Sequence, residues 1–303
     1  MAAKPIAMQL FYATRSWLAL AVATASGMTV AADAGLTIID DSGVEVHLES
    51  PATRIVSLAP HITELMYELD AGARVIATVD HSDFPAAARQ LPRVGSAHKL
   101  DLERIVGLQP DLIVAWRSGN PVAEVERLRT LGLSVYITEP RALDDIADSL
   151  QDLGALIGAK ERGDSLAESF RTQARQTIAQ YAGRAPVNVF YQIWDDPLMT
   201  LNGDHIISEL LQHCGGVNVF ADLPTLAPQV GTEAVLAADP DVILVSGSAR
   251  TGPEWVDHWR AWRRLKAVQN HHIYFIPPDF VQRQTPRILQ GMERICAALD
   301  RAR

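Results

Sequence analysis

Aromatic side chains recur just beyond the ends of the apolar runs that we expect to be strands. They are Phe84, Trp116, Trp194 and Phe280, which follow the runs at residues 75–79, 111–115, 187–193 and 272–276. The carboxyl ends of parallel strands meet at one edge of a sheet, where α/β proteins bind their ligands. Aromatic faces with a few polar neighbours, here Asp279 and Arg283, suit a large flat molecule. The pattern favours a binding cleft, although each ring could instead fill its own lobe.

Patterns of catalytic or metal-binding residues are weak. The chain has no Gly-x-Ser-x-Gly elbow, no phosphate loop and no Cys-x-x-Cys. His61 with Glu64, and His271 with His272, are the nearest approach to a metal pair, and such residues more often cap helices or lie on the surface. We therefore expect no catalytic residue, no metal site and no enzyme.

The only two cysteines are Cys214 and Cys296. In an exported protein, an even pair of cysteines favours a disulfide. Two buried free thiols are the alternative.

The first 32 residues predict a secretory signal peptide. Lys4 and Arg15 precede an apolar stretch at residues 17–30, and small residues precede Asp33. A membrane anchor is the weaker alternative, because the stretch is short and contains Thr, Ser and Gly. We expect cleavage after Ala32.

Composition predicts an acidic two-domain protein. The chain has 303 residues, of which 48% are hydrophobic, and a net charge of −9. Loss of Lys4 and Arg15 takes the charge to −11 (−9 minus 2). So negative a chain does not favour nucleic acid or anionic lipid as a partner.

The order of apolar runs predicts an α/β fold in several parts. An N-terminal hairpin at 33–52, turning at Asp41–Gly43, precedes an α/β lobe at 53–142. A helical connector at 143–182, which we expect Gly158 and Gly163 to interrupt, leads to a second α/β lobe at 183–303. The short, non-alternating strands are typical of parallel sheets covered on both faces.

The two α/β segments repeat one another. Glu103 corresponds to Glu233 and Pro110 to Pro240, both at an offset of 130 residues. Thr63-Glu-Leu65 before Ala71-Gly72 is likewise matched by Ser208-Glu-Leu210 before Gly215-Gly216. Two matches in the same order favour two similar lobes with a shared crevice.

Several motifs resemble the periplasmic cobalamin-binding proteins of vitamin B12 importers, within the helical-backbone (class III) solute-binding superfamily. The motifs are Arg54-Ile-Val-Ser-Leu-Ala-Pro-His-Ile-Thr-Glu64, Ser82-Asp-Phe-Pro85, Pro110-Asp-Leu-Ile-Val-Ala-Trp-Arg117, Cys214-Gly-Gly-Val-Asn-Val-Phe220 and Pro286-Arg-Ile288. The likeness runs from about Arg54 to Leu299.

The resemblance implies two Rossmann-like lobes with parallel sheets, joined by a single long helix, with a preformed cleft for a corrinoid. Phe84 stands where the family has a Tyr, and Trp116 matches a cleft Trp. The loop that touches the corrin edge corresponds to Asp279, Phe280, Val281, Gln282 and Arg283. Cys214 and Cys296 match the family disulfide.

The chain also departs from the family pattern. Two aromatic cleft positions of the family correspond to Ala97 and Ala227. Trp194 stands at a family Gly and is expected to fill part of the vacated space. We therefore expect a remodelled pocket.

The resemblance also implies partners. Glu103 and Glu233 match the carboxylates that dock onto arginines of an ABC permease, which acts with its ATPase in the inner membrane. The protein would be a periplasmic monomer without a cofactor of its own, because the corrinoid carries the cobalt. A haem or ferric-siderophore binder of the same superfamily is the alternative. Its candidate residues are Arg117 and Arg283 for an anionic chelate, and His61, His81 and His98 as axial ligands.

Overall fold

The computed structural model describes Met1, residues 35–247 and residues 251–303. The predicted signal peptide, apart from Met1, lies outside the described residues. The described residues from 35 onward belong to one compact unit. None of its helices is long and apolar enough to cross a membrane.

The N-terminal hairpin forms as expected. Strands β1 (Leu36–Ile39) and β2 (Glu45–Leu48) pair antiparallel. Gly43 has a φ of +82°, a backbone conformation that glycine adopts without a steric penalty. The buried carboxylate of Asp40 accepts hydrogen bonds from Ser42 and Val44 and ties the turn together.

The first lobe is built on a parallel four-stranded sheet of order β4-β3-β7-β8. Its main elements are β3 (Ile55–Ser57), α1 (Pro60–Glu68), β4 (Val75–Thr78), α2 (Leu102–Gly107), β7 (Leu112–Trp116), α3 (Val122–Thr130) and β8 (Val135–Thr138). Two short strands, β5 (Gly95–Ser96) and β6 (Lys99–Leu100), and the 3-10 turns η1 (Gly72–Arg74) and η2 (Ala86–Gln90) complete it. The central strands are buried on both faces, which explains their continuous apolar runs.

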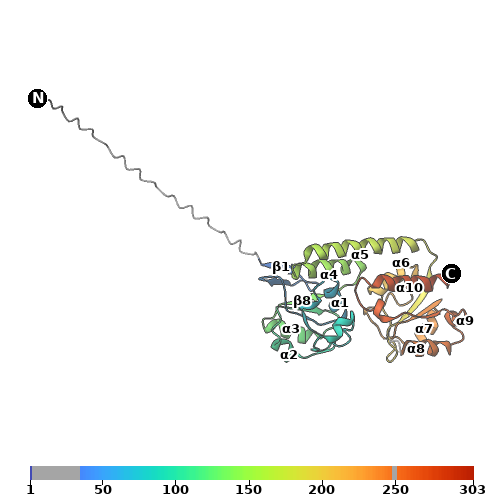
Figure 1. Cartoon of the computed structure of the whole chain (residues 1–303). Helices are drawn as coiled ribbons and strands as arrows, with labels where there is room; N and C mark the ends of the chain where they lie inside the picture. The colour runs from blue at the N-terminus through green and yellow to red at the C-terminus, as the bar shows by residue number, and fades with distance from the viewer. Residues whose placement is uncertain (2–34, 248–250) are drawn as a thin grey trace. The chain divides into compact units, whose positions relative to one another are not determined.

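The helical connector is an antiparallel pair of helices, with the predicted break at Gly158. It consists of α4 (Leu143–Leu156) and the 22-residue α5 (Lys160–Tyr181), which Figure 1 shows running along both lobes. Gly158, with a φ of +69°, makes the break between them. Gly163 does not interrupt the helix, contrary to expectation. It lies within α5 against Gly154, where a Cβ on Gly154 would come within 2.9 Å of the Gly163 Cα. Both glycines allow the two helices to approach closely.

The second lobe repeats the first. Its parallel sheet has the order β10-β9-β11-β12. Its elements are β9 (Val187–Gln192), α6 (Ile206–His213), β10 (Gly216–Asn218), α7 (Thr232–Ala238), β11 (Val242–Val245), α8 (Thr251–Arg260), α9 (Lys266–Gln269), β12 (Ile273–Phe275), the 3-10 turn η3 (Pro278–Phe280) and α10 (Ile288–Asp300). Helix α2 leads into β7 as α7 leads into β11, so the sequence repeat marks equivalent elements.

A hydrophobic core links the lobes behind the sheets. One cluster of buried side chains joins residues of β3 and α1 to residues of α4, α5, α6 and α10. Smaller clusters cover the other face of each sheet. The fold is thus the two-lobed α/β architecture with a long joining helix, α5, that the family resemblance implies.

Candidate functional site

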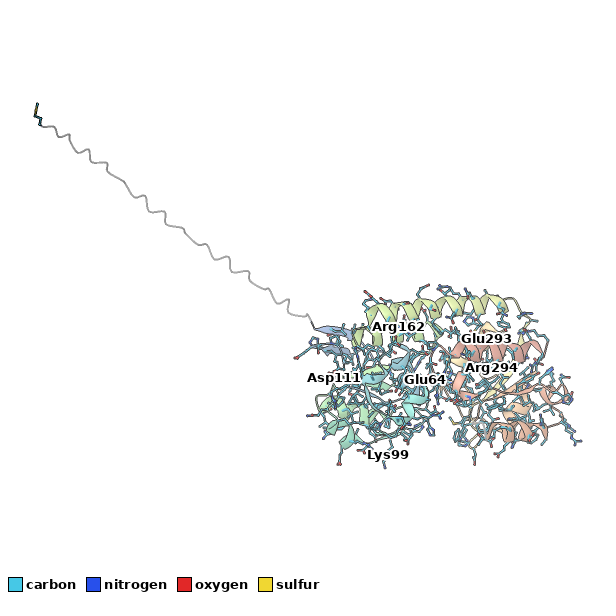
Figure 2. The ribbon with its side chains drawn as sticks, viewed as in Figure 1. Glu64, Lys99, Asp111, Arg162, Glu293 and Arg294 are labelled. Carbon is cyan, nitrogen blue, oxygen red and sulfur yellow. A yellow bond between two sulfur atoms is a disulfide. The ribbon has the colours of Figure 1, made fainter. Side chains whose placement is uncertain are left out.

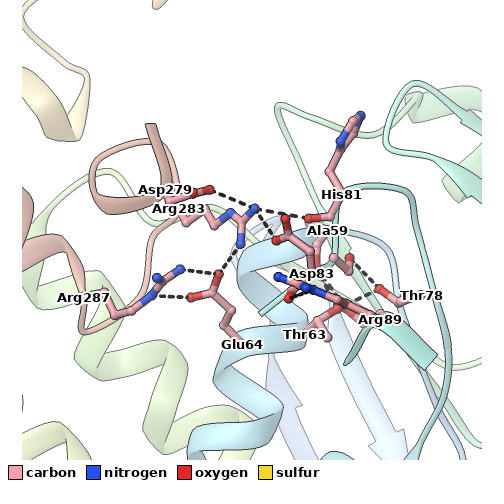
Figure 3. Close-up of polar contacts among 12 residues, drawn as sticks. Ala59, Thr63, Glu64, Thr78, His81, Asp83, Arg89, Asp279, Arg283 and Arg287 are labelled. Atoms are coloured by element: carbon pink, nitrogen blue, oxygen red, sulfur yellow. Dashed lines mark hydrogen bonds and ion pairs between the residues drawn. The ribbon is translucent and has the colours of Figure 1, made fainter. Parts of the chain in front are cut away.

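A buried carboxylate of the first lobe holds two arginines of the second. Glu64 lies in α1 with only 2% of its side chain exposed, at the edge of its lobe that is next to the second lobe (Figure 2). It accepts hydrogen bonds from Arg283 at 2.6 Å and from two nitrogens of Arg287 at 3.0 and 2.8 Å (Figure 3). A buried charge requires such compensation, because desolvation of an unpaired carboxylate costs several kcal/mol.

Arg283 extends this contact toward solvent. Its Nη2 donates to Asp83 at 2.7 Å and to the backbone oxygen of His81 at 3.2 Å, and lies 3.0 Å from Asp279 (Figure 3). Partial burial would raise the pKa of Asp83, but the hydrogen bond and charge of Arg283 outweigh it and hold that pKa below its ordinary value. Two predicted ligand residues, Asp279 and Arg283, therefore come together, with Asp83 as a third member.

Two predicted aromatic contacts border this network. The Arg287 guanidinium lies 3.8 Å from the centre of the Phe84 ring and 5.5 Å from that of Phe280. Both distances suit a cation–π interaction. Phe84 remains 39% exposed, so part of its ring is accessible although one face is packed.

Trp116 is held by its own loop. It is the last residue of β7, not a residue beyond the strand as predicted. Its backbone N–H donates to the Asn120 side chain at 2.7 Å, and Asn120 in turn donates to the backbone oxygens of Leu58 and Ala97. A methyl group on Gly119 would overlap the Trp116 ring, so the ring packs directly on that glycine. The indole orientation is thereby fixed.

His61 packs edge-on against Trp116, with ring centres 5.2 Å apart. It is the second residue of α1 and is almost completely buried, and its Nε2 has no hydrogen-bond partner among the described residues. Burial, and secondarily the positive charge of Arg283, lower the pKa of His61 to about 3. The imidazole is therefore neutral at physiological pH, with one nitrogen unpaired.

A small pocket lies between the lobes beside Trp116. Ser118, Glu139 and Arg141 line it from the first lobe, and His205 and Gln284 from the second. Its volume of about 20 Å³ has room for about one water molecule, so this pocket by itself is too small for a corrin ring. Gln284 Oε1, and Thr285 Oγ1 next to it in sequence, are buried without a hydrogen-bond partner in the described part of the chain.

Other predicted contacts lie apart from this centre. Trp194, two residues beyond β9, is 56% exposed and packs edge-on against Trp255. The Gln282 amide donates to the backbone oxygen of Ser246 at 2.9 Å. Val281 is fully buried in the core, where it packs close to Gly291, so its side chain does not line a cleft.

The remaining predicted residues have distinct places. Glu103 and Glu233 are both exposed in the first turns of the equivalent helices α2 and α7, which lie on the side opposite α5 in Figure 1. Cys214 and Cys296 form a disulfide, as predicted. Within residues 35–247 and 251–303, no three His, Cys, Asp or Glu side chains gather as a metal site.

Sequence reasoning missed the centre of the network. Glu64 was noted as part of a weak metal pair, of the internal repeat and of a family motif, and Arg287 only within a family motif, but neither was expected to form an ion pair. A glutamate between Ile62 and Leu65 in an apolar helix is a signal, because a buried charge needs a partner. The sequence does not reveal which of its arginines is that partner.

The comparisons with known proteins agree with this architecture. A family model described as periplasmic binding protein matches residues 55–280. The vitamin B12-binding protein of Vibrio cholerae is 40% identical over 250 residues, which are 82% of this chain and 90% of the relative. The crystal structure of the vitamin B12-binding protein of Vibrio cholerae superposes with a TM-score of 0.78 at 40% identity, over 83% of this chain and 98% of that one.

More distant structures share only the fold. The periplasmic haem-binding protein of Roseiflexus sp. RS-1 superposes with a TM-score of 0.74 at 24% identity, over 83% of this chain and 100% of that one. The family model alone spans most of the chain, and the 40% identical relative is covered almost completely. The chain therefore belongs to the periplasmic binding protein family.

Proposed function

We propose that the protein captures a corrinoid of the cobalamin type between its lobes and delivers it to an ABC importer in the inner membrane. The observation that carries this proposal is the similarity over nearly the whole fold to proteins named for vitamin B12 binding. The proposed contacts are Phe84, Trp116, Trp194, Asp279, Phe280 and Arg283. The protein needs no cofactor, because a corrinoid brings its own cobalt.

The charge of the site favours a neutral ligand periphery. The two guanidinium groups of Arg283 and Arg287 contact three carboxylates, those of Glu64, Asp83 and Asp279. The cluster therefore has a net charge of −1, two positive against three negative. Haem carboxylates or an anionic ferric chelate would meet repulsion here rather than a free arginine.

The unpaired polar atoms fit the same ligand class. His61 Nε2, Gln284 Oε1 and Thr285 Oγ1 are neutral and buried without partners in the described residues. A corrin ring carries amide side chains, which both donate and accept hydrogen bonds. Leaving a buried polar atom unpaired costs about 1–3 kcal/mol, so a ligand amide that reaches one of these atoms gains affinity.

The aromatic residues supply the flat contacts. The exposed ring of Phe84 and the half-buried indole of Trp116 both lie on the first lobe, and Trp194 is exposed on the second. The pocket beside Trp116 has room for about one water molecule, so a corrin ring would lie against these aromatic faces outside that pocket.

Delivery would use the acidic residues Glu103 and Glu233. They are exposed on equivalent helices of similar lobes, an arrangement that fits a transporter with two similar halves. Opposite charges on the permease would orient the protein as it docks. The signal peptide proposed for residues 1–32 would bring the mature chain to the periplasm as a monomer.

Isothermal titration calorimetry tests the ligand assignment. The mature protein, refolded without ligand, is titrated separately with cyanocobalamin, haemin and an anionic ferric catecholate. We expect one-to-one binding of cyanocobalamin with a submicromolar Kd, and much weaker binding of the other two. Saturable binding of haemin or of the ferric chelate, without binding of cyanocobalamin, would contradict the proposal.

A further inference from the structure

Burial decreases along the inter-lobe ion-pair network. The exposed fraction of the side chain is 2% for Glu64, 12% for Arg283 and 17% for Arg287. It rises to 52% for Asp83 and 55% for Asp279. The network thus has a buried end at Glu64 and Arg287 and a solvent-exposed end at the two aspartates, with Arg283 between them.

We propose that Glu64 is a positioning residue for ligand binding. Its carboxylate, together with Arg287, braces the two lobes and holds Arg283 with its Nη2 directed to the mouth of the cleft. The inference rests on the proposed corrinoid function, which it deepens by assigning a role to two residues that contact each other rather than the ligand.

The hydrogen bonds at the buried end of the network fix the position of Arg287 relative to Glu64. Arg287 uses Nε and Nη2 on the two oxygens of Glu64, a bidentate arrangement that fixes direction as well as distance. The same Glu64 oxygen Oε1 also accepts from Nη1 of Arg283. Because α1 belongs to the first lobe and Arg287 precedes α10 of the second, this contact sets the separation of the lobes at that point.

At the exposed end of the network, a ligand group can exchange with an aspartate on Arg283. The Arg283 Nη2 contacts Asp83, Asp279 and the backbone oxygen of His81, and both aspartates are accessible to water. Exposed ion pairs contribute little free energy, about 0–1 kcal/mol. A ligand carbonyl can therefore replace an aspartate on Arg283, while Glu64 keeps the guanidinium in place.

The position of the Phe84 ring depends on the same contact between Glu64 and Arg287. Its ring lies against the guanidinium of Arg287, which Glu64 fixes. Loss of the Glu64 carboxylate would therefore release both the polar contact at Arg283 and the aromatic contact at Phe84. The effect on affinity would exceed that of losing one hydrogen bond.

The first test compares two glutamates of the same helix. Glu64→Gln keeps the shape but replaces one acceptor oxygen by an NH2 group that faces a guanidinium. Glu68→Gln, one turn later, is the matched control, because the backbone oxygen of Glu68, not its carboxylate, accepts a hydrogen bond from Arg162. We expect the Kd for cyanocobalamin to rise about tenfold or more in Glu64→Gln and to stay unchanged in Glu68→Gln. Equal Kd values in wild type and Glu64→Gln would overturn the proposal.

A double-mutant cycle separates positioning from general stability. If Glu64 acts through Arg283, Glu64→Gln weakens binding much less in an Arg283→Ala background than in the wild type. Additive effects on Kd would overturn the proposal, because they indicate that Glu64 acts independently of Arg283. Should Glu64→Gln fail to fold, Arg287→Lys replaces it, since lysine keeps the charge but cannot form the bidentate contact.

Small-angle X-ray scattering of the ligand-free protein tests the brace without any ligand. We expect a larger radius of gyration for Glu64→Gln than for wild type and Glu68→Gln. If the wild type does not bind cyanocobalamin, the proposed function is overturned. The radius of gyration still tests whether Glu64 holds the two lobes together. An unchanged radius of gyration would then overturn the brace as well.

Discussion

Glu64 and Arg287 are 223 residues apart in the sequence, yet the arginine donates two hydrogen bonds to the glutamate, at 3.0 and 2.8 Å. The pair joins the first helix of one lobe to the segment that precedes the last helix of the other. Around it lie Phe84, Asp279 and Arg283, three of the predicted ligand contacts. The proposed inter-lobe site would therefore be organised by ion pairs between the lobes as well as by the strand ends.

Replacing Gly119 by Ala should displace Trp116. The added methyl would overlap the indole ring, so the ring must move before a ligand can stack on it. We expect a several-fold weaker Kd for cyanocobalamin and a changed near-ultraviolet circular dichroism spectrum. Gly107→Ala is the control, because a Cβ there meets no neighbouring atom. Identical spectra and Kd values for Gly119→Ala and wild type would show that Trp116 is not held in this way.

The protein should lose stability as the pH falls from about 6.5 toward 3. Burial, and then Arg283, lower the pKa of His61 to about 3, whereas the unfolded chain binds a proton near pH 6.5. Between these values the unfolded state holds more protons, so the free energy of unfolding decreases by about 1.4 kcal/mol per pH unit for this group. His205, whose pKa burial lowers to about 4, adds to the slope.

Urea unfolding at several pH values measures this effect. His61→Asn should flatten the pH dependence between pH 6.5 and 3, whereas His98→Asn, at an exposed position, should not. A slope that is the same in His61→Asn and wild type would mean that His61 is not buried in its neutral form.

The disulfide should contribute strongly to stability. It joins Cys214 at the end of α6 to Cys296 within α10, across a sequence separation of 82 residues. The chain-entropy estimate for a loop of this length is roughly 4 kcal/mol. We expect the double variant Cys214→Ala/Cys296→Ala to unfold at clearly lower urea concentration, and reduced wild type to behave in the same way. Coincident unfolding curves would contradict a stabilising bridge.

Charge reversal at the two proposed docking residues should separate binding from transport. In Glu103→Arg/Glu233→Arg, the ligand Kd should be unchanged, because both residues are exposed in the first turns of α2 and α7. Uptake by cells that depend on the importer should fall more than about tenfold, since opposite charges no longer meet at the permease. Glu45→Arg, on the exposed hairpin, is the control. Normal uptake by the double variant would exclude the docking role.

The sequence predicted the elements better than their contacts. The apolar runs located the strands, because short parallel strands buried on both faces leave a continuous pattern, as in β7 and β11. Gly163 was misjudged because a glycine that breaks a helix and one that permits helices to cross have the same sequence signature.

For the proposed site too, the sequence predicted nearby residues better than contacts between distant segments. Aromatic residues near strand ends, such as Phe84 and Trp116, follow from local order along the chain. The inter-lobe contact between Glu64 and Arg287 depends on how two distant segments pack, and no local pattern specifies it. Val281 shows that a residue in a loop proposed to contact the ligand can have its side chain in the core, which the sequence does not reveal.

Calorimetric titration of cyanocobalamin into wild type and Trp116→Ala shows whether the corrinoid binds between the lobes, with Trp262→Ala as a control at a partly exposed tryptophan outside the proposed site. We expect one-to-one binding by wild type and by Trp262→Ala. The Kd should be about tenfold to a hundredfold higher for Trp116→Ala, because a central aromatic contact is lost. Equal affinity in all three proteins, or no binding by the wild type, would contradict a corrinoid site between the lobes.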